Sequence, residues 1–572
     1  MARKSSYTVS GVPLNRFSRS QFDLSHGHKT SASMGYLYPL DPIEVLPGDT
    51  FKGEFNLVAR LSSSFVKPIM DNIFIDVYHF FVPSRILYVN FVNIFGENTE
   101  SAWANTQEYE VPFVSSSMNN FLEPNQAGSS AQVGCHFGLP IDMDLDSMEG
   151  GINLSVLPFR AFAMVYNDFF RDQNSIPPMN ITKGETTDNE GFNTNPWSPS
   201  NYTGLVPKVA KLHDYFTSAL PSPQKGDAVD IPLSLVSPIP VVARPEEHTT
   251  IYDGTPLKII TQTNAYSNGV IATDGAGANR SLQIKQNSNT SGDGYDFGIT
   301  NMYAEPGSYL TDLTVNELRL AFQTQKMLER DARCGTRYVE YLLGHWGVTS
   351  GDSRLQRPEF LGGRRIPINV QQIAQTTGFS TSSAPNTLAQ LGAYSLSGGR
   401  SKFTKSFVEH GYIISCFCIR QFHSYQQGIP KLWQRKKRLD FYEPVFANIG
   451  EQPIYQNQLF TSQTTNAIGA NGSRPIFGYQ EAWAEYRQLP NIISGQMNSN
   501  SNDSLDIWHL GDIYASAPIL GEQFINETDA NLNRVITVNS SSQDQFILDF
   551  WEDLKAVRNM PTYSVPSLID HN

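Results

Sequence analysis

The stretch that decides the fold is Ile73-Phe74-Ile75-Asp76-Val77-Tyr78-His79-Phe80-Phe81-Val82, which is followed by Pro83. Nearly every residue in this stretch is β-branched or aromatic, and such side chains favour extended strands. An apolar run without regular polar alternation is typical of a strand that is buried on both faces. Proline ends the run, because it lacks the amide hydrogen that a continuing sheet strand would need. We therefore predict a central strand over residues 73–82.

Two other segments have strand character and lie far apart along the chain. After a turn at Pro47-Gly48-Asp49, apolar residues alternate with polar or small ones over residues 55–61, which predicts a half-buried strand. Residues 412–419 resemble the central strand but follow it by more than 300 residues. If these strands share one sheet system, their pairing is non-local, as in sandwiches with long crossing connections.

Helices are few and have clear sequence signals. Pro158 precedes an apolar stripe of helical period that ends before Pro177, which predicts one helix. Residues 314–317 form a capping box that predicts the start of a second helix. We expect both stripes to face the core; they consist of Phe159, Phe162, Ala163, Tyr166, Phe169 and Phe170 in the first helix, and of Leu318, Ala321, Phe322 and Leu328 in the second.

Composition narrows the class of protein. The chain has 572 residues, which is too long for one ordinary domain, and only 17% are charged, against roughly 25% in an average globular chain. This balance excludes a coiled coil and a charge-driven disordered protein. Four cysteines cannot build a disulfide framework. The polar, basic N-terminus resembles no secretory signal, and 18 consecutive apolar residues never occur, so we expect a soluble, intracellularly made protein without membrane insertion.

Enzymatic motifs are missing from the sequence. It contains no phosphate-binding P-loop, no His-Glu-x-x-His, no Gly-x-Ser-x-Gly and no dinucleotide-binding glycine pattern between a strand and a helix. Asp142, Asp144 and Asp146 resemble the opening of a calcium loop, but Ser147 replaces the required glycine, and a solvated acidic loop is the competing interpretation. We therefore predict neither an enzyme nor a cofactor.

Basic residues gather in two places. Arg435, Lys436, Lys437 and Arg438 are flanked by Trp433, Phe441 and Tyr442, a combination that suits single-stranded nucleic acid because cations meet phosphates and rings stack on bases. The alternative is a solvated loop, or pairing with acids on a partner chain. The N-terminal arm carries Arg3, Lys4, Arg16 and Arg19, which could touch phosphates, reach a neighbouring subunit or belong to a loosely ordered terminus.

Several segments resemble one family. Residues 157–162 and 166–174, Leu-Pro-Phe-Arg-Ala-Phe and Tyr-Asn-Asp-Phe-Phe-Arg-Asp-Gln-Asn, are similar to a helix of the major capsid proteins of Microviridae, the small icosahedral single-stranded-DNA phages. Residues 44–50, 80–85, 213–221, 317–338 and 354–359 also fit this family. The matches span most of residues 15–375, and the length together with the Asn-, Gly- and Ser-rich stretch at 261–303 indicates the gokushovirus branch.

The resemblance implies a fold and a domain organisation. We expect a mainly β protein, an eight-stranded antiparallel jelly roll of viral capsid type with long loop insertions and a few short helices. Residues 1–40 would form an extended N-terminal arm, and residues 41–226 and 306–572 the jelly-roll core with its interface loops. Residues 227–305 would form a surface insertion that protrudes at the threefold axis. Host-attachment candidates in this insertion are Asp274, Asn279, Asn289, Asp293 and Tyr295.

The resemblance also implies a function and partners. Sixty copies would build a T=1 shell around circular single-stranded DNA, together with a minor pilot-type capsid protein and, during assembly in the bacterial cytoplasm, a scaffolding protein. The chain has a formal net charge of −13, so a shell that holds polyanionic DNA needs added cations. A small basic packaging protein would supply most of them, and the two basic groups would face inward as a supplement.

A second class of function fits the same fold. Jelly rolls also occur in β-rich carbohydrate-binding or carbohydrate-active proteins, and the fold alone does not separate them from capsid proteins. Such secreted enzymes would be expected to show a signal peptide and a conspicuous acid pair. Particles of megadalton mass would indicate a capsid, and we expect an isolated subunit to be poorly stable or to aggregate.

Overall fold

The computed structural model is mainly β, with antiparallel sheets and short helices. It describes residues 19–63, 65–67, 69–97, 109–115, 127–141, 153–185, 204–227, 229, 241–243, 259–260, 270–273, 282–285, 298–299, 302–304, 315–368, 372–374, 376, 391–394, 396–467 and 474–563. By their contacts these residues belong to two compact units, one of residues 1–225 and 329–572 and one of residues 226–328.

The first large sheet, called the β5 sheet, has the C-terminal strand in its interior. Its order is β1–β24–β5–β18, and β2 pairs with the same edge of β24 as β1 does. Because β1 and β2 follow each other along one edge of β24, they act as a single strand that is interrupted at residues 24–25. The bounds are Ser20–Asp23 for β1, His26–Ala32 for β2, Thr50–Leu61 for β5, Ser397–Ser406 for β18 and Phe546–Arg558 for β24.

The second large sheet, called the β6 sheet, contains the two apolar runs that the sequence singled out. Its order is β15–β6–β19, and β3 and β4 follow each other along the free edge of β19. Residue Tyr78 lies opposite Cys416, which confirms the predicted pairing across more than 300 residues. The bounds are Leu37–Pro39 for β3, Ile43–Val45 for β4, Ile73–Pro83 for β6, Glu359–Ile368 for β15 and Gly411–Gln421 for β19.

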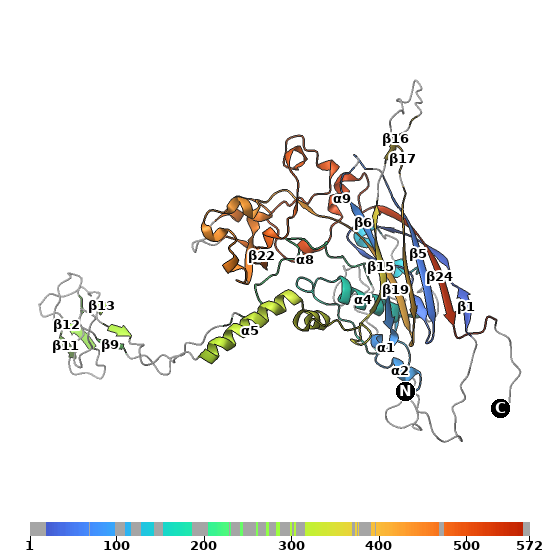
Figure 1. The fold of residues 1–572 in the computed structure, drawn as a ribbon, viewed down its shortest axis with the longest axis horizontal. Coiled ribbons are helices and arrows are strands. Elements are labelled where there is room, and N and C mark those ends of the chain that lie inside the picture. Colours follow the sequence, from blue (N-terminus) through green and yellow to red (C-terminus); the bar gives the residue numbers. More distant parts are fainter. Residues whose placement is uncertain are drawn as a thin grey trace, which may run out of the picture. The chain divides into compact units, whose positions relative to one another are not determined.

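These two sheets form a jelly roll. When each interrupted edge strand is counted once, each sheet has four strands, and all pairings within both sheets are antiparallel. Among these strands, the chain changes sheet at every step except the one from β6 to β15. Figure 1 shows the sheets packed face to face. The predicted eight-stranded jelly roll is confirmed, and it is the arrangement in which non-local neighbours pair.

The space between the sheets is filled by alternating side chains. Strand β5 alternates buried and exposed residues along its length, and Phe51 and Phe55 point into the core. The fully buried His79 of β6 links the two sheets, since its ring nitrogens lie 2.9 Å from Ser415 Oγ on β19 and 3.0 Å from Ser401 Oγ on β18. Burial lowers the pKa of His79 to about 3, so the ring is a neutral structural bridge.

Strand β6 is buried on both faces, as predicted. One face meets the β5 sheet, and on the other face Phe80 packs against Phe169 with ring centroids 4.7 Å apart. The charged residue in this strand, Asp76, is compensated by two cations on the flanking strands. Its carboxylate accepts hydrogen bonds from Arg365 on β15 and Arg420 on β19, which lower the pKa of Asp76 despite its burial.

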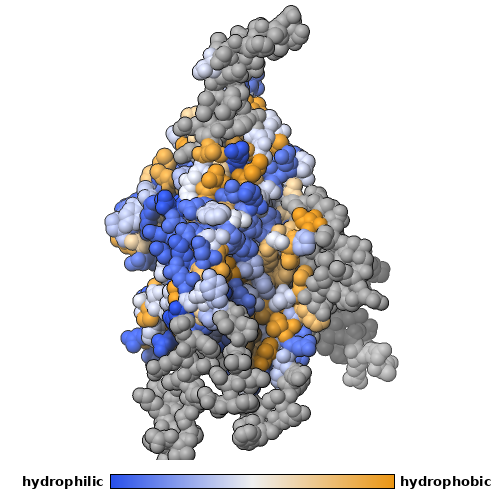
Figure 2. Space-filling model, turned by 90° about the vertical axis from the view of Figure 1, so that its right-hand side faces the viewer, coloured by the Kyte–Doolittle hydropathy of each residue, from blue (hydrophilic) through white to orange (hydrophobic). Residues whose placement is uncertain are grey.

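The two faces of the jelly roll differ in what covers them. Helix α4 packs on β19 of the β6 sheet, and in Figure 1 the segment between β19 and β24 lies on this same side. The outer face of the β5 sheet is shown in Figure 2 as mainly hydrophilic with scattered hydrophobic side chains. Lys52, Arg60 and Lys402 are exposed on it.

Helices are short apart from α5. Helix α4 spans Leu157–Val165 with a proline in its first turn and is buried nearly throughout, so the predicted core stripe of this helix is confirmed. Directly after α4, the chain forms one π-helical turn over Tyr166–Phe170. The other helices are α1 Ser84–Leu87, α2 Phe91–Ile94, α3 Val133–His136, α5 Val315–Cys334, α6 Tyr338–Tyr341, α7 Gln463–Asn466, α8 Glu522–Ile525 and α9 Ala530–Val535.

The second predicted helix forms, but its stripe is not a core face. Within α5 only Ala332 is buried, whereas Phe322 is 63% exposed and Leu318 is half-buried. The prediction that this stripe faces the core was therefore wrong. A helical period identifies an apolar face of a helix, but it does not show whether that face packs against the same chain or against another one. No helix in the described part of the chain is long and apolar enough to cross a membrane.

Small strand pairs complete the structure. In the first unit they are β7 Phe113–Ser115 with β8 Asn153–Ser155, β16 Gln372–Ala374 with β17 Leu391–Tyr394, β20 Ser424–Tyr425 with β23 Asn491–Ile492, and β21 Glu451–Tyr455 with β22 Ile476–Glu481. The second unit contains β9 Val241–Ala243 with β14 Met302–Ala304, β10 Ile259–Ile260 with β13 Gly298–Ile299, and β11 Val270–Thr273 with β12 Leu282–Lys285.

The segment between β19 and β24 has a core of its own. Phe216, Phe477 and Phe524 pack together there with edge-to-face rings, and Tyr425 joins them. This cluster combines the loop after residue 209 with the long connection of residues 422–545, so two segments that are remote in sequence fold as one layer.

A buried charge network fixes this layer to the end of β19. His423 is fully buried and lies 2.9 Å from Asp512 Oδ1 and 3.0 Å from Glu527 Oε2. Asp512 also accepts hydrogen bonds from Lys211 Nζ at 3.0 Å and from the Tyr514 hydroxyl at 2.9 Å. Burial alone would lower the pKa of His423, but the two carboxylates raise it to about 10. At neutral pH the imidazolium of His423 and the ammonium of Lys211 therefore balance the charges of the two buried carboxylates.

Replacing His423 with alanine should lower the free energy of unfolding by about 3–5 kcal/mol, because two buried carboxylates lose their shared cation. Since the folded-state pKa is raised, this stabilisation is complete below the unfolded-state pKa of about 6.5 and is lost as the pH rises towards about 10. Urea unfolding followed by tryptophan fluorescence at neutral and alkaline pH measures both effects. The exposed His213, changed to alanine, is the matched control, and an unchanged unfolding midpoint in His423→Ala would contradict the stabilising role of this charge network.

Candidate assembly surface

An unusual density of exposed apolar side chains occurs in one short segment, residues 432–449, which we call the 432–449 surface. The segment lies between β20 and β21 and consists largely of three short 3₁₀ turns, Lys431–Gln434, Arg438–Asp440 and Pro444–Phe446. The exposed fraction reaches 77% for Trp433 and 86% for Val445. The other large apolar side chains exposed there are Leu432, Leu439, Phe441, Tyr442, Phe446 and Ile449.

The local sequence explains why these side chains point outward. Pro444 stands at the first position of its turn, where its fixed backbone angle suits the geometry. The carboxylate of Asp440 accepts backbone hydrogen bonds from Lys436 and Lys437, both at 2.7 Å, and these bonds lower the pKa of Asp440. Turns this short satisfy their backbone groups locally but bury few of their own side chains, so the apolar residues remain on the surface.

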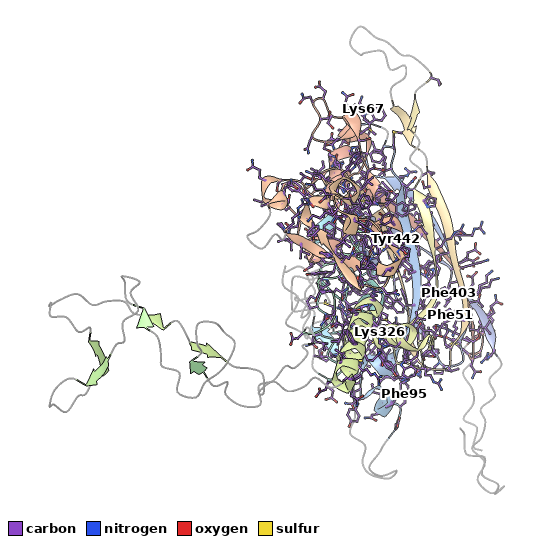
Figure 3. All side chains as sticks on the ribbon, turned by 60° about the vertical axis from the view of Figure 1, so that its left-hand side comes forward. Phe51, Lys67, Phe95, Lys326, Phe403 and Tyr442 are labelled. Atoms are coloured by element: carbon purple, nitrogen blue, oxygen red, sulfur yellow. The ribbon has the colours of Figure 1, made fainter. Side chains whose placement is uncertain are left out.

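The backbone of the surface is held firmly against a neighbouring turn, Ala484–Tyr486. The indole nitrogen of Trp483 donates a hydrogen bond to the Phe446 carbonyl at 3.0 Å. Glu485 forms ion pairs with Lys431 at 3.4 Å and with Arg435 at 3.1 Å. Figure 3 labels Tyr442 in this part of the chain, and Phe51 and Phe403 in the strands of the β5 sheet. The apolar side chains thus stand on a fixed frame.

The predicted basic cluster lies within this surface, and its four cations have different environments. Arg435 is only 7% exposed; it pairs with Glu485, and its guanidinium lies over the Tyr486 ring at 4.4 Å. Arg438 is 85% exposed and pairs with Glu443 at 2.9 Å. Lys436 and Lys437 are exposed, and among the described residues no acidic side chain forms an ion pair with them.

The remaining candidate residues are mostly beyond what the structure describes. Arg19, which directly precedes β1, is exposed. The candidates outside the described residues are Arg3, Lys4 and Arg16 of the arm, Asp142, Asp144 and Asp146 of the acidic loop, and Asp274, Asn279, Asn289, Asp293 and Tyr295 of the insertion.

A second group of exposed apolar side chains follows α5. Tyr338 is 64% exposed and Trp346 is 70% exposed, with Leu343 and Val348 between and after them. From the sequence, Trp433, Phe441 and Tyr442 were expected only as base-stacking residues, and neither segment was predicted to be an exposed apolar surface. The available signal was the accumulation of Trp, Phe, Tyr and Leu in segments without periodicity.

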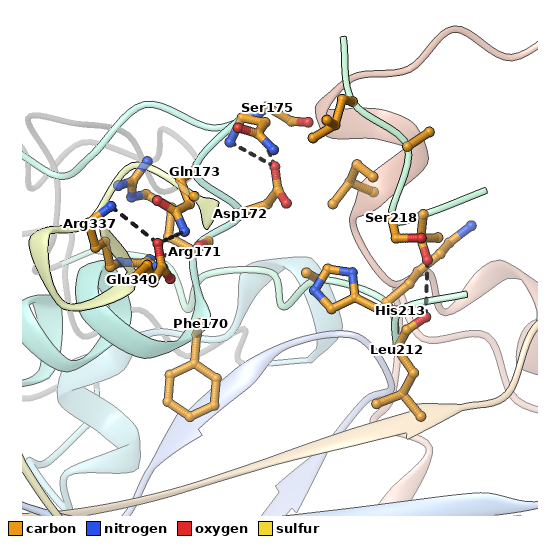
Figure 4. A pocket seen from close by; sticks show the side chains of 18 of the residues that line it. Phe170, Arg171, Asp172, Gln173, Ser175, Leu212, His213, Ser218, Arg337 and Glu340 are labelled. Carbon is orange, nitrogen blue, oxygen red and sulfur yellow. Dashed lines mark hydrogen bonds and ion pairs between the residues drawn. The ribbon is translucent and has the colours of Figure 1, made fainter. Parts of the chain in front are cut away.

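The structure also contains a pocket of about 590 Å³ lined by residues 169–175, 209–213, 217–220, 332–335, 337 and 340 together with Arg420 and Ile525 (Figure 4). Its charged groups are engaged in structural contacts. Glu340 accepts hydrogen bonds from Gln173 and from Arg337, the latter at 3.2 Å, and Asp172 accepts backbone hydrogen bonds from Asn174 and Ser175. Among the described side chains of this lining, no serine or cysteine is hydrogen-bonded to a histidine as nucleophilic catalysis requires.

Comparison with known proteins agrees with a structural role. The sequence profile of the family described as "Capsid protein (F protein)" matches residues 10–568. The chain is 35% identical over 570 residues to capsid protein VP1 of Bdellovibrio phage phiMH2K, covering 99% of this chain and 98% of that protein. It is 33% identical to capsid protein VP1 of Chlamydia phage 1, with coverage of 98% and 97%, and 33% identical to that of Spiroplasma virus 4, with coverage of 97% and 96%.

These similarities extend over nearly the whole length of each relative. They favour a capsid protein over a carbohydrate-binding or carbohydrate-active protein. They confirm the resemblance to capsid proteins of Microviridae and a location in the virion, and capsid proteins are a structural family rather than enzymes. The jelly roll, the exposed apolar surfaces and the end-to-end matches lead to one conclusion: the chain belongs to the capsid protein (F protein) family of phages.

Proposed function

We propose that sixty copies of this chain close into a T=1 icosahedral shell of gokushovirus type around a circular single-stranded DNA genome. The observation that carries the proposal is the 432–449 surface on a chain of a capsid family. Large exposed apolar patches on a folded chain mark sites of protein–protein contact. The occupant of this surface is a second copy of the same chain, since a capsid protein forms its shell from its own neighbours.

The frame beneath the 432–449 surface favours tight docking. Side chains on a backbone that is already fixed lose less conformational freedom on binding, so more of the burial energy is retained as affinity. Trp433, Phe441 and Tyr442 are aromatic, and aromatic side chains are enriched among the residues that dominate interface energies. Arg435 forms an ion pair with Glu485 and so holds the backbone of the surface in place. The exposed Lys436 and Lys437 are available for a phosphate or an acidic neighbour.

DNA enclosure depends on cations from two sources. The chain itself carries a net charge of −13, so sixty copies form an anionic shell whose genome has to be neutralised separately. A small basic packaging protein supplies most of this charge. The exposed Arg19, the arm residues Arg3, Lys4 and Arg16, and the pair Lys436 and Lys437 add a smaller contribution on the inner surface.

The insertion of residues 227–305 serves host attachment as a protrusion at the threefold axis. Its support is compositional: residues 261–303 are dominated by Asn, Gly, Ser and Thr, and such a segment suits a surface that meets a receptor better than a core. A minor pilot-type protein completes the particle, and a scaffolding protein assists assembly in the bacterial cytoplasm.

Placing a charge on the 432–449 surface should prevent shell formation without unfolding the chain. In Trp433→Glu and Val445→Glu, the altered side chains already lie in water, so the stability of the subunit changes little while the contact with a neighbour is lost. Velocity sedimentation and negative-stain microscopy should show free subunits or irregular aggregates instead of closed particles. Asn500→Glu adds the same charge at an exposed polar position and should assemble normally. Intact particles of both surface variants would contradict the assignment.

Removing Lys436 and Lys437 should reduce the salt dependence of single-stranded DNA binding. Each phosphate contact contributes about 0.7 to the slope of log affinity against log salt, so the double alanine variant should lose about 1.4. Filter binding of an oligonucleotide at several salt concentrations measures this slope. The exposed Lys67, changed to alanine, is the control. A particle map with Lys436 and Lys437 on the outer surface would refute their proposed role.

Replacing residues 227–305 with a short Gly/Ser linker should leave particles intact but abolish adsorption to the host. We expect particle formation not to depend on this insertion, because residues 226–328 form a compact unit of their own. A milder variant changes Asp274, Asn279, Asn289, Asp293 and Tyr295 to alanine. Sedimentation of cell-bound particles measures adsorption, and normal adsorption of the linker variant would exclude attachment through this segment.

A further inference from the structure

Three potential metal ligands meet where the N-terminal and C-terminal strands pair. His26 Nε2 lies 2.8 Å from Asp41 Oδ2 and 3.8 Å from Glu552 Oε2. One ligand atom from each of these residues lies within 4.8 Å of the other two. An imidazole nitrogen and two carboxylate oxygens are donors that divalent transition metals such as zinc accept, with bonds of about 2.0–2.2 Å.

The tertiary fold alone brings these residues together. His26 begins β2 and lies directly opposite Glu552 of β24. Asp41 lies in the interruption between β3 and β4, where the chain leaves the edge of the β6 sheet. The cluster therefore joins both sheets of the jelly roll and connects residues that are more than 500 positions apart.

Glu552 is the observation that points to a ligand. Its side chain is fully buried, and neither carboxylate oxygen has a hydrogen-bond partner. A buried carboxylate without a partner is costly, and proteins normally neutralise it with a proton, a cation or a metal ion. The side chain points towards His26 and Asp41 rather than towards a hydrogen-bond donor.

The surrounding contacts orient the donors as an outer shell does around a metal. His26 Nδ1 lies 2.8 Å from the Leu24 carbonyl, which directs Nε2 towards the two acids. His28 Nδ1 lies 2.9 Å from the second oxygen of Asp41 and holds that carboxylate in place. Ligating histidines and carboxylates are commonly fixed by hydrogen bonds of this kind. His26 and Asp41 are partly exposed, at 39% and 27%, so the cluster is open to an ion from solvent.

We propose that His26, Asp41 and Glu552 bind one divalent transition-metal ion of the zinc class, with water completing the coordination. His26 would ligate through Nε2, and Asp41 and Glu552 through one oxygen each. The ion would tie β2, the segment between β3 and β4, and β24 together. This inference concerns the folded chain and does not depend on the proposed shell geometry.

Zinc binding to the full-length chain tests the proposal. After dialysis against Zn²⁺ and removal of free metal, elemental analysis should give one ion per chain, and the thermal midpoint should rise relative to metal-free protein. Co²⁺ in place of zinc should give a visible absorption band that Zn²⁺ abolishes. His26→Gln and Glu552→Gln should each abolish stoichiometric binding and the thermal shift. His28→Gln, which removes an orienting contact, should weaken binding by about tenfold or more.

His345→Gln removes another histidine that pairs with an acid, Asp331 at 2.9 Å, outside the cluster, and it should bind zinc as the unaltered chain does. Zinc bound with equal stoichiometry and affinity by the His26 and Glu552 variants would overturn the proposal, as would an unaltered chain that binds none. Should Glu552→Gln fail to fold, the His26 and His28 variants, both altered at partly exposed residues, decide the matter.

Discussion

The insertion of strand β24 between β5 and the interrupted strand β1–β2 is the interaction on which the structure depends. The described residues of β1 and β2 pair with β24 alone, and β5 pairs with it along nearly its whole length. Without β24, the β5 sheet would separate into pieces with unsatisfied edges. The fold therefore cannot close until both ends of a 572-residue chain have met, which makes the last pairing entropically demanding.

The jelly roll acts as a frame that leaves its long connections to form other surfaces. Helix α4 and the layer around Phe216 and Phe524 pack on or beside the β6 sheet, while the β5 sheet has a largely polar outer face. Many exposed apolar residues lie on these connections. They are found on α5, in the segment that follows α5, and on the 432–449 surface. A capsid subunit is incomplete as a folding unit, since part of its apolar area is buried only by neighbours.

Charged groups within the subunit mainly hold segments in place. His423 fixes the connection between β19 and β24 through two acids, and Asp76 joins three strands through two arginines. Arg435, which the sequence placed in a basic cluster, is used in the same way through Glu485. Such pairs fix geometry because breaking one would leave a buried charge without a partner. The small share of charged residues in the chain, 17%, is consistent with charged side chains that serve mainly as such structural contacts.

The sequence by itself determined the local elements and the family. The apolar run at 73–82, the alternation at 55–61 and the stripe after Pro158 each predicted an element that the structure contains, because local periodicity reflects which faces of an element are buried. The motifs at 157–174 indicated the capsid family that the comparisons then showed. Only the tertiary structure decided that α5 exposes its stripe, that Arg435 pairs with Glu485, and that His26, Asp41 and Glu552 meet. Each of these depends on which distant segments become neighbours, and strand pairing across hundreds of residues leaves no periodic trace in the sequence.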